Sequence, residues 1–84
     1  MAKLIKVDGE ITELQPRNGE YFELEEMQGY VEGLIEPVYL PDGTIILVNE
    51  EGLLQNMGLN LTATLMAGFP LVGPALHVTD EEFR

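Results

Sequence analysis

Two Asp-Gly dipeptides, each set between runs of strand-forming residues, limit the folds open to this chain. Asp8-Gly9 lies within the alternating segment 3–14, and Asp42-Gly43 lies within the apolar segment 34–48. Asp-Gly favours a type I′ turn, in which both central residues have positive φ and two antiparallel strands are joined. The sequence therefore predicts two β-hairpins.

The arms of these hairpins differ in how deeply they should be buried. Leu4 and Ile11 provide apolar faces for the first hairpin. In the second, Pro37 has no N–H to donate, so its arm should lie at a sheet edge or be bulged there. The other arm contains Ile45–Val48, four consecutive apolar residues, which indicates a strand buried on both faces.

Helical spacing follows the first hairpin, in residues 22–32. Leu24, Met27 and Val31 stand at i, i+3 and i+7 and so share one face. Gly33 then offers the positive φ that ends many helices. The sequence predicts a helix of two to three turns here.

A second short helix is predicted over residues 60–68, with Asn60 as its N-cap and Gly68 as its terminator. A last strand should occupy residues 70–78, interrupted at Gly73-Pro74. The sequence after it, Thr79-Asp-Glu-Glu, has the pattern of a capping box and at most one helical turn.

These elements follow the order β-β-α-β-β-α-β. Hairpins that alternate with helices are typical of an α+β domain. We therefore expect residues 1–84 to form a single domain with a small, mostly antiparallel sheet, covered on one face by two short helices.

The length and composition exclude several classes of protein. An 84-residue chain buries a small core, and without cysteine it has neither disulfides nor thiolate zinc sites, which fits the cytoplasm. Neither a signal peptide nor a bilayer-spanning segment is visible. Because 45% of the residues are hydrophobic, we expect a homo-oligomer that buries what one small core cannot.

The net charge of −11 restricts the possible partners. Fifteen acids against four lysines and arginines repel phosphate backbones and anionic membranes. We therefore expect no direct nucleic-acid binding and no membrane partner. Two functional interpretations remain, a basic partner or the imitation of nucleic acid, beside simple solubility.

Catalytic and cofactor motifs are not visible. The chain has no cysteine or serine nucleophile, and its one histidine, His77, lies in a predicted strand. No phosphate loop or EF-hand loop is present, and the paired acids are spread along the chain. The sequence predicts a protein that is not an enzyme and has no cofactor and no metal site.

One polar segment stands out, at the end of the buried strand. Asn49-Glu50-Glu51-Gly52 forms a stable turn if Asn49 bonds its own backbone and Gly52 adopts positive φ. Turn formation accounts for the amide and the glycine but not for the two carboxylates. If this turn is instead the rim of a binding site, the converging polar residues are Asn49, Glu50, Glu51, Asn60, Thr62 and Thr64.

The segment from Gly29 to Leu76 resembles a family of small uncharacterised proteins of bacteriophages and bacterial mobile elements, defined as a domain of unknown function. The shared features fall on Val7–Ile11, Gly33–Glu36, Asn49–Gly52, Asn60 with Ala63-Thr64, and Gly68 with Leu71–Gly73. Together they cover nearly the whole chain. A departure is Glu32, where such proteins often have a second glycine. The resemblance implies an accessory protein in a host bacterial cytoplasm and carries no catalytic residues.

These observations favour a protein that acts by binding. The expected function is counter-defence, in which the protein sequesters or blocks a host factor, either a protein or a small nucleotide-like signal. The alternative is an acidic DNA mimic that inhibits a nucleic-acid-binding protein. Ionic strength separates the two, because mimicry weakens steeply with salt.

Overall fold

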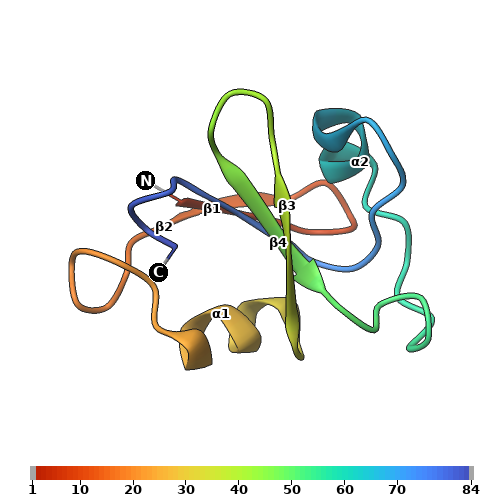
Figure 1. Ribbon diagram of the computed structural model, residues 1–84. Coiled ribbons are helices and arrows are strands. Elements are labelled where there is room, and N and C mark those ends of the chain that lie inside the picture. Colours follow the sequence, from red (N-terminus) through yellow and green to blue (C-terminus); the bar gives the residue numbers. More distant parts are fainter. Residues whose placement is uncertain (1, 84) are drawn as a thin grey trace.

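The computed structural model describes residues 2–83 and has seven elements of regular structure (Figure 1). One five-stranded antiparallel sheet and two short helices confirm the predicted α+β fold and its order, β-β-α-β-β-α-β. The elements are β1 (Ala2–Ile5), β2 (Ile11–Leu14), α1 (Leu24–Val31), β3 (Ile35–Tyr39), β4 (Ile45–Asn49), α2 (Leu61–Ala67) and β5 (Ala75–Val78).

The strand order is β2-β1-β5-β4-β3, so the last strand in sequence occupies the centre of the sheet. β5 pairs with β1 through Leu76 opposite Leu4, and with β4 through Leu76 opposite Leu47. Within the sheet that residues 2–83 form, the two predicted hairpins, β1-β2 and β3-β4, are therefore joined only through β5.

The two helices lie on opposite faces of the sheet, so the prediction that both cover one face is wrong (Figure 1). Ile45 and Leu47 of β4 pack in the core cluster beneath α1, whereas Ile46 and Val48 pack in the cluster beneath α2. Successive side chains of a strand point to opposite faces of the sheet, and here each face is covered by one of the helices. This explains the confirmed burial of β4 on both faces.

On the α1 face, the helix contributes Met27 and Val31 to the core, as its spacing predicts. Leu24 is exposed, which corrects its assignment to the buried face, and the chain instead places Phe22 in the core. The Phe22 ring packs edge to face against Tyr30, with centroids 6.4 Å apart.

Both hairpin turns have three-residue loops rather than the predicted type I′ geometry. Lys6 N–H bonds Glu10 O, and Leu40 N–H bonds Thr44 O. Only the glycines, Gly9 and Gly43, have positive φ; the aspartates before them do not. Each aspartate instead accepts a hydrogen bond from the backbone two residues on, the Asx arrangement that fixes a type I turn with a glycine bulge.

The end of α1 also differs from the prediction. Glu32, not Gly33, adopts the left-handed conformation, with φ of 66°. Gly33 serves another purpose, because a Cβ at this position would lie 2.6 Å from Asn49 Nδ2. The glycine lets the start of β3 approach the end of β4.

The remaining elements follow the sequence closely. Pro37 lies in edge strand β3, and Asn60 and Gly68 cap α2 as predicted. β5 is shorter than expected and begins at Ala75, after Gly73 with φ of 77°. The Glu82 carboxylate accepts from Thr79 N–H at 2.9 Å, which confirms the capping-box pattern in a turn.

Candidate functional site

Asn49 ends β4 and ties three segments together. Its Nδ2 donates to the carbonyls of Val31 and Glu32, at 3.2 and 3.0 Å, which are left without partners where α1 ends. Its Oδ1 accepts from Glu51 N–H at 2.7 Å. The side chain is buried, so its role in this structure is to hold the turn against the end of α1.

Gly52 closes this turn with its N–H bonded to Asn49 O at 3.1 Å. It does not have positive φ, which corrects the reason given for a glycine here. A Cβ would lie 2.7 Å from Val72 Cγ2, so the position requires a residue without a side chain. Close approach to residues 69–72 therefore explains the glycine.

Asn60 anchors the other side of the site. Its Oδ1 caps α2 by accepting from Ala63 N–H, and its Nδ2 donates to the carbonyls of Ile5 and Gly73, both at 2.9 Å. The side chain is fully buried. It thereby fixes the start of α2 to β1 and to the segment that precedes β5.

The two threonines of α2 are half-buried, and Thr64 holds the segment after the helix. Its Oγ1 accepts from Leu71 N–H at 2.9 Å and lies 3.3 Å from Leu71 O. No side-chain hydrogen bond of Thr62 is present among residues 2–83. Thr64 therefore places Leu71 beside the turn that Asn49 organises.

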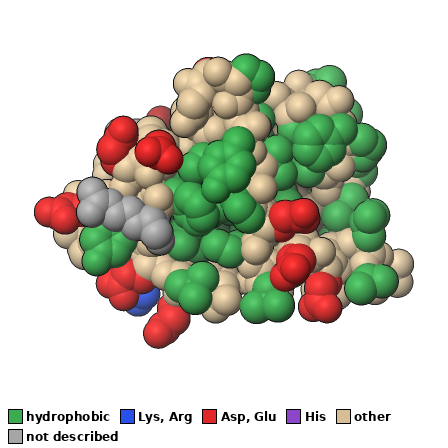
Figure 2. Space-filling model, in the orientation of Figure 1, with side chains coloured by type: hydrophobic (Ala, Val, Ile, Leu, Met, Phe, Trp, Pro, Cys, Tyr) green, Lys and Arg blue, Asp and Glu red, His purple; other side chains and the backbone are tan. Residues whose placement is uncertain are grey.

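A groove lies between this turn and the segment after α2. It has a volume of about 400 Å³ and is lined by residues 48–54 and 69–72 together with Glu36. Val48, Leu71 and Val72 form apolar walls, and Leu53 and Leu54 stand at its border, 79% and 82% exposed. Figure 2 shows acidic side chains beside the apolar side chains around this end of β4.

The structure brings only some of the predicted polar residues to the groove. Asn49, Glu50 and Glu51 line it, whereas Asn60, Thr62 and Thr64 lie outside its lining. Asn60 bonds Gly73 O and Thr64 bonds Leu71 N–H, so these two side chains hold the segment that forms one wall. The prediction missed the apolar walls. Their signal is the pair of segments "GLL" at 52–54 and "GFPL" at 68–71, which place large apolar residues directly after glycines.

The charge of the groove is entirely negative. Glu36, Glu50 and Glu51 are exposed and make no side-chain hydrogen bond or ion pair with residues 2–83. None of the lining residues is lysine, arginine or histidine. Carboxylates at the border of an apolar groove attract cations and repel phosphate groups.

A second polar cluster joins Asp42, Thr44 and His77 on the α2 face of the sheet. Thr44 Oγ1 donates to Asp42 Oδ1 at 2.6 Å, so His77 Nε2, at 2.8 Å, donates its own N–H to the hydroxyl oxygen. A catalytic triad needs the reverse, a hydroxyl that donates to the imidazole. This cluster therefore contains no activated nucleophile.

The pKa directions agree with this arrangement. Burial lowers the pKa of His77, against an opposing effect of Asp42. The hydrogen bonds from Thr44 hold the pKa of Asp42 below its usual value. The neutral imidazole and ionised carboxylate are the forms that this set of hydrogen bonds favours.

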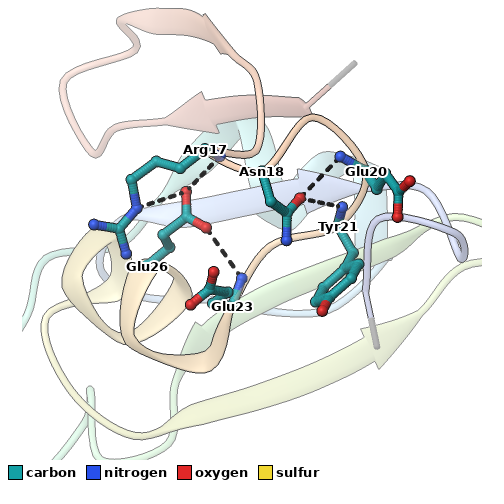
Figure 3. A network of polar contacts seen from close by, with 6 residues as sticks. All are labelled: Arg17, Asn18, Glu20, Tyr21, Glu23 and Glu26. Atoms are coloured by element: carbon teal, nitrogen blue, oxygen red, sulfur yellow. Dashed lines mark hydrogen bonds and ion pairs between the residues drawn. The ribbon is translucent and has the colours of Figure 1, made fainter.

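A third cluster surrounds Glu26 at the start of α1 (Figure 3). One Glu26 oxygen accepts from Arg17 N–H and the other from Glu23 N–H, both at 3.1 Å, with Arg17 Nε 3.5 Å away. In the same loop, Asn18 Oδ1 accepts from two backbone N–H groups. Both Glu26 oxygens are engaged in holding the loop to the helix, so this cluster is structural.

Within residues 2–83, no group of three potential metal-ligating His, Asp or Glu side chains converges. In the same range, neither helix is long or apolar enough to cross a bilayer.

Comparison with known proteins adds a family and no function. No curated protein and no solved structure matches the sequence. The family described as a domain of unknown function (DUF3846) matches residues 2–84. That match spans nearly the full sequence, including every element described above, and the chain therefore belongs to this family.

Proposed function

We propose that this protein acts by binding, without covalent chemistry, and that the groove beside the Asn49–Gly52 turn is its binding site. The observation that carries the proposal is an apolar groove whose charged lining residues, Glu36, Glu50 and Glu51, are all carboxylates. Apolar walls with a few convergent polar groups are typical of binding sites.

The chemistry of the groove favours a protein segment over a nucleotide. A nucleotide phosphate would meet Glu50 and Glu51 with no lining cation to balance it. A segment with one large apolar side chain between lysines or arginines matches both features, because the apolar side chain enters the groove and the cations meet the carboxylates. The partner we propose is therefore a basic protein segment.

In biological terms, we propose that the protein is a phage or mobile-element accessory protein in a bacterial cytoplasm, where it blocks or sequesters a host factor. The resemblance noted in the sequence supports this context, and the net charge of −11 supports a basic target. A DNA mimic would also bind basic proteins. The apolar walls favour groove binding, because mimicry of a phosphate backbone requires only surface charge.

The test is binding of a fluorescent probe peptide with a central phenylalanine between lysines, followed by anisotropy. The variant E50Q/E51Q should weaken binding about tenfold, because each lost charge contact is worth about 0.5–1 kcal/mol. The control E20Q/E81Q removes the same charge from exposed acids outside the groove and should change affinity little.

Two further measurements separate the groove from non-specific attraction. Replacing phenylalanine with serine in the probe should abolish binding, and raised salt should weaken the binding that remains with the original probe. Equal losses in E50Q/E51Q and E20Q/E81Q would contradict the groove proposal. Binding that ignores the phenylalanine would favour the DNA-mimic alternative.

A further inference from the structure

A phenylalanine stands half-exposed at the groove. Phe69 is one of the lining residues, is 49% exposed and belongs to neither core cluster. Among residues 2–83, no other aromatic ring packs against it. The ring therefore does not serve to build the core, although a buried aromatic side chain would contribute much apolar area there.

The segment that carries Phe69 is fixed on both sides of it. Gly68 ends α2 with φ of 85°, and its N–H donates to Thr64 O at 2.9 Å. Leu71 N–H donates to Thr64 Oγ1 at 2.9 Å, and Leu71 O accepts from Asn60 N–H at 2.8 Å. The backbone thus holds the ring at the groove without burying it.

The two adjacent carboxylates of the groove are held in a similar way. Glu50 N–H donates to Leu34 O at 2.8 Å, and Glu51 N–H donates to Asn49 Oδ1 at 2.7 Å. Their backbone is fixed, whereas both side chains are exposed and have no internal hydrogen bond or ion pair within residues 2–83. Groups that are held in place before binding lose less conformational freedom when a ligand arrives.

The ring and the carboxylates belong to the two facing sides of the groove. The turn with Glu50 and Glu51 approaches the segment with Phe69 so closely that a Cβ on Gly52 would lie 2.7 Å from Val72 Cγ2. The groove between them has a volume of about 400 Å³. One cationic side chain that enters this space can therefore reach the carboxylates on one side and the ring on the other.

We propose that the groove selects arginine over lysine in the basic segment that it binds, with Phe69 as the residue that determines this specificity. The inference rests on the proposed function and states which cation the partner supplies. Glu50 and Glu51 accept hydrogen bonds from the guanidinium group, and the flat face of that group stacks on the Phe69 ring.

Both kinds of lining group favour a guanidinium over an ammonium. The guanidinium is planar, presents paired N–H donors that match a carboxylate, and stacks on aromatic rings. It is also more weakly hydrated than the lysine ammonium, so it loses less when water is removed beside the ring. The carboxylates alone would attract either cation, and the discrimination between them therefore depends on the ring.

The test compares three fluorescent probe peptides by anisotropy. Each has a central phenylalanine, flanked by lysines, by arginines or by citrullines, which keep the planar shape of arginine without its charge. The native protein should bind the arginine probe about fivefold more tightly than the lysine probe, the ratio expected from one cation–π contact at a partly exposed site. The citrulline probe should bind far more weakly than either. Equal affinity for arginine and lysine would overturn the proposal, and so would a citrulline probe that binds as tightly as the arginine probe.

Variants of the ring identify the residue responsible. F69L keeps an apolar side chain but removes the ring, so the arginine-to-lysine ratio should fall to about twofold or less, whereas F69W should keep it because tryptophan binds cations best. Y39L is the matched control, since Tyr39 is 69% exposed and lies outside the lining of the groove. Circular dichroism checks that each variant is folded. A ratio that is unchanged in F69L, or lost equally in Y39L, would overturn the role of Phe69.

The two proposals fail in different ways. If E50Q/E51Q weakens both charged probes while native protein binds arginine and lysine equally, the groove proposal stands and the selection of arginine is overturned. If neither charged probe binds the native protein, the groove proposal fails, and the inference about arginine fails with it.

Discussion

His77 is a partly buried histidine of β5 that bonds a threonine beside the neighbouring strand. Its Nε2 bonds Thr44 across two strands, and burial lowers its pKa while Asp42 and Glu82 act to raise it and Lys3 to lower it further. At residue scale, the consequence is a pH dependence of stability.

The direction of this pH dependence follows from the direction in which the pKa of His77 is shifted. The folded pKa of His77 lies below the unfolded value of 6.5, so the unfolded chain binds the proton more readily. The stability contributed by neutral His77 is complete above that value and is lost as the pH falls through the folded pKa. We predict that the free energy of unfolding of the native protein, minus that of H77Q, decreases between about pH 7.5 and pH 5. Urea titrations at each pH measure it, and a constant difference would contradict the prediction.

Glu32 occupies a position that glycine suits better. Its left-handed φ of 66° strains a residue with a side chain, whereas the glycine stands one position later. We predict that E32G raises the free energy of unfolding by about 0.5–1 kcal/mol, because glycine adopts this conformation without strain.

The matched control, G33A, should have the opposite effect on stability. G33A should destabilise the protein by more than about 1 kcal/mol, because its Cβ would press on Asn49 Nδ2. This is the usual loss of stability when a group is added to a packed site. Denaturant titrations of both variants give the comparison. Stabilisation by both, or by neither, would show that the conformation of residue 32 does not limit stability.

At the scale of elements, local signals predicted most of the fold. Aspartate-glycine dipeptides located both hairpins, and Asn60 and Gly68 located α2. The turn geometry was wrong because one residue more than a type I′ loop enters each turn. These signals act over a few residues, so they identify an element but not its neighbours.

The faces of the elements could not be predicted in the same way. Leu24 fits the apolar spacing of α1 but is exposed, whereas Glu26 is buried and accepts hydrogen bonds from Arg17 N–H and Glu23 N–H. In α2 the alanines, not the leucines, face the sheet. Both outcomes depend on contacts with residues outside the element, which the spacing within one element does not contain.

One side of the groove could be predicted from the sequence and the other could not. Asn49, Glu50 and Glu51 follow one another in sequence, so a local pattern could locate that side. The opposite wall, with Leu71, is placed by Thr64 and Asn60 from another part of the chain. The predicted polar group therefore contains both residues that line the groove and residues that position its wall.

Asn60 should be the main anchor of α2. We predict that N60A lowers the free energy of unfolding by about 3 kcal/mol, since it removes the N-cap and the two hydrogen bonds donated to the buried carbonyls of Ile5 and Gly73. N60S keeps a cap oxygen but loses the two donated hydrogen bonds, so its free energy of unfolding should lie between those of N60A and the native protein. Urea unfolding measures the series; equal stability of N60A and the native chain would show that α2 is held in another way.

At the scale of the whole molecule, net charge dominates. With −11 on a chain whose Cα radius of gyration is 11.6 Å, the acids repel one another in the folded state more than in the expanded one. We predict that the urea midpoint rises as sodium chloride is raised from about 0.01 to 1 M, because screening relieves this repulsion. The urea midpoint of E20Q/E81Q should rise less with salt, because this variant carries less negative charge. A midpoint that falls with salt would show that ion pairs outweigh repulsion.

The central position of β5 has a consequence for synthesis of the protein. During translation, the β1-β2 and β3-β4 hairpins emerge first, and each carries an inner edge that only β5 can fill. Until Ala75–Val78 has been made, the nascent chain has open strand edges and two half-built apolar layers. Completion of the sheet must therefore await the last strand, and the interval before it is when the polypeptide is most exposed to aggregation and proteolysis.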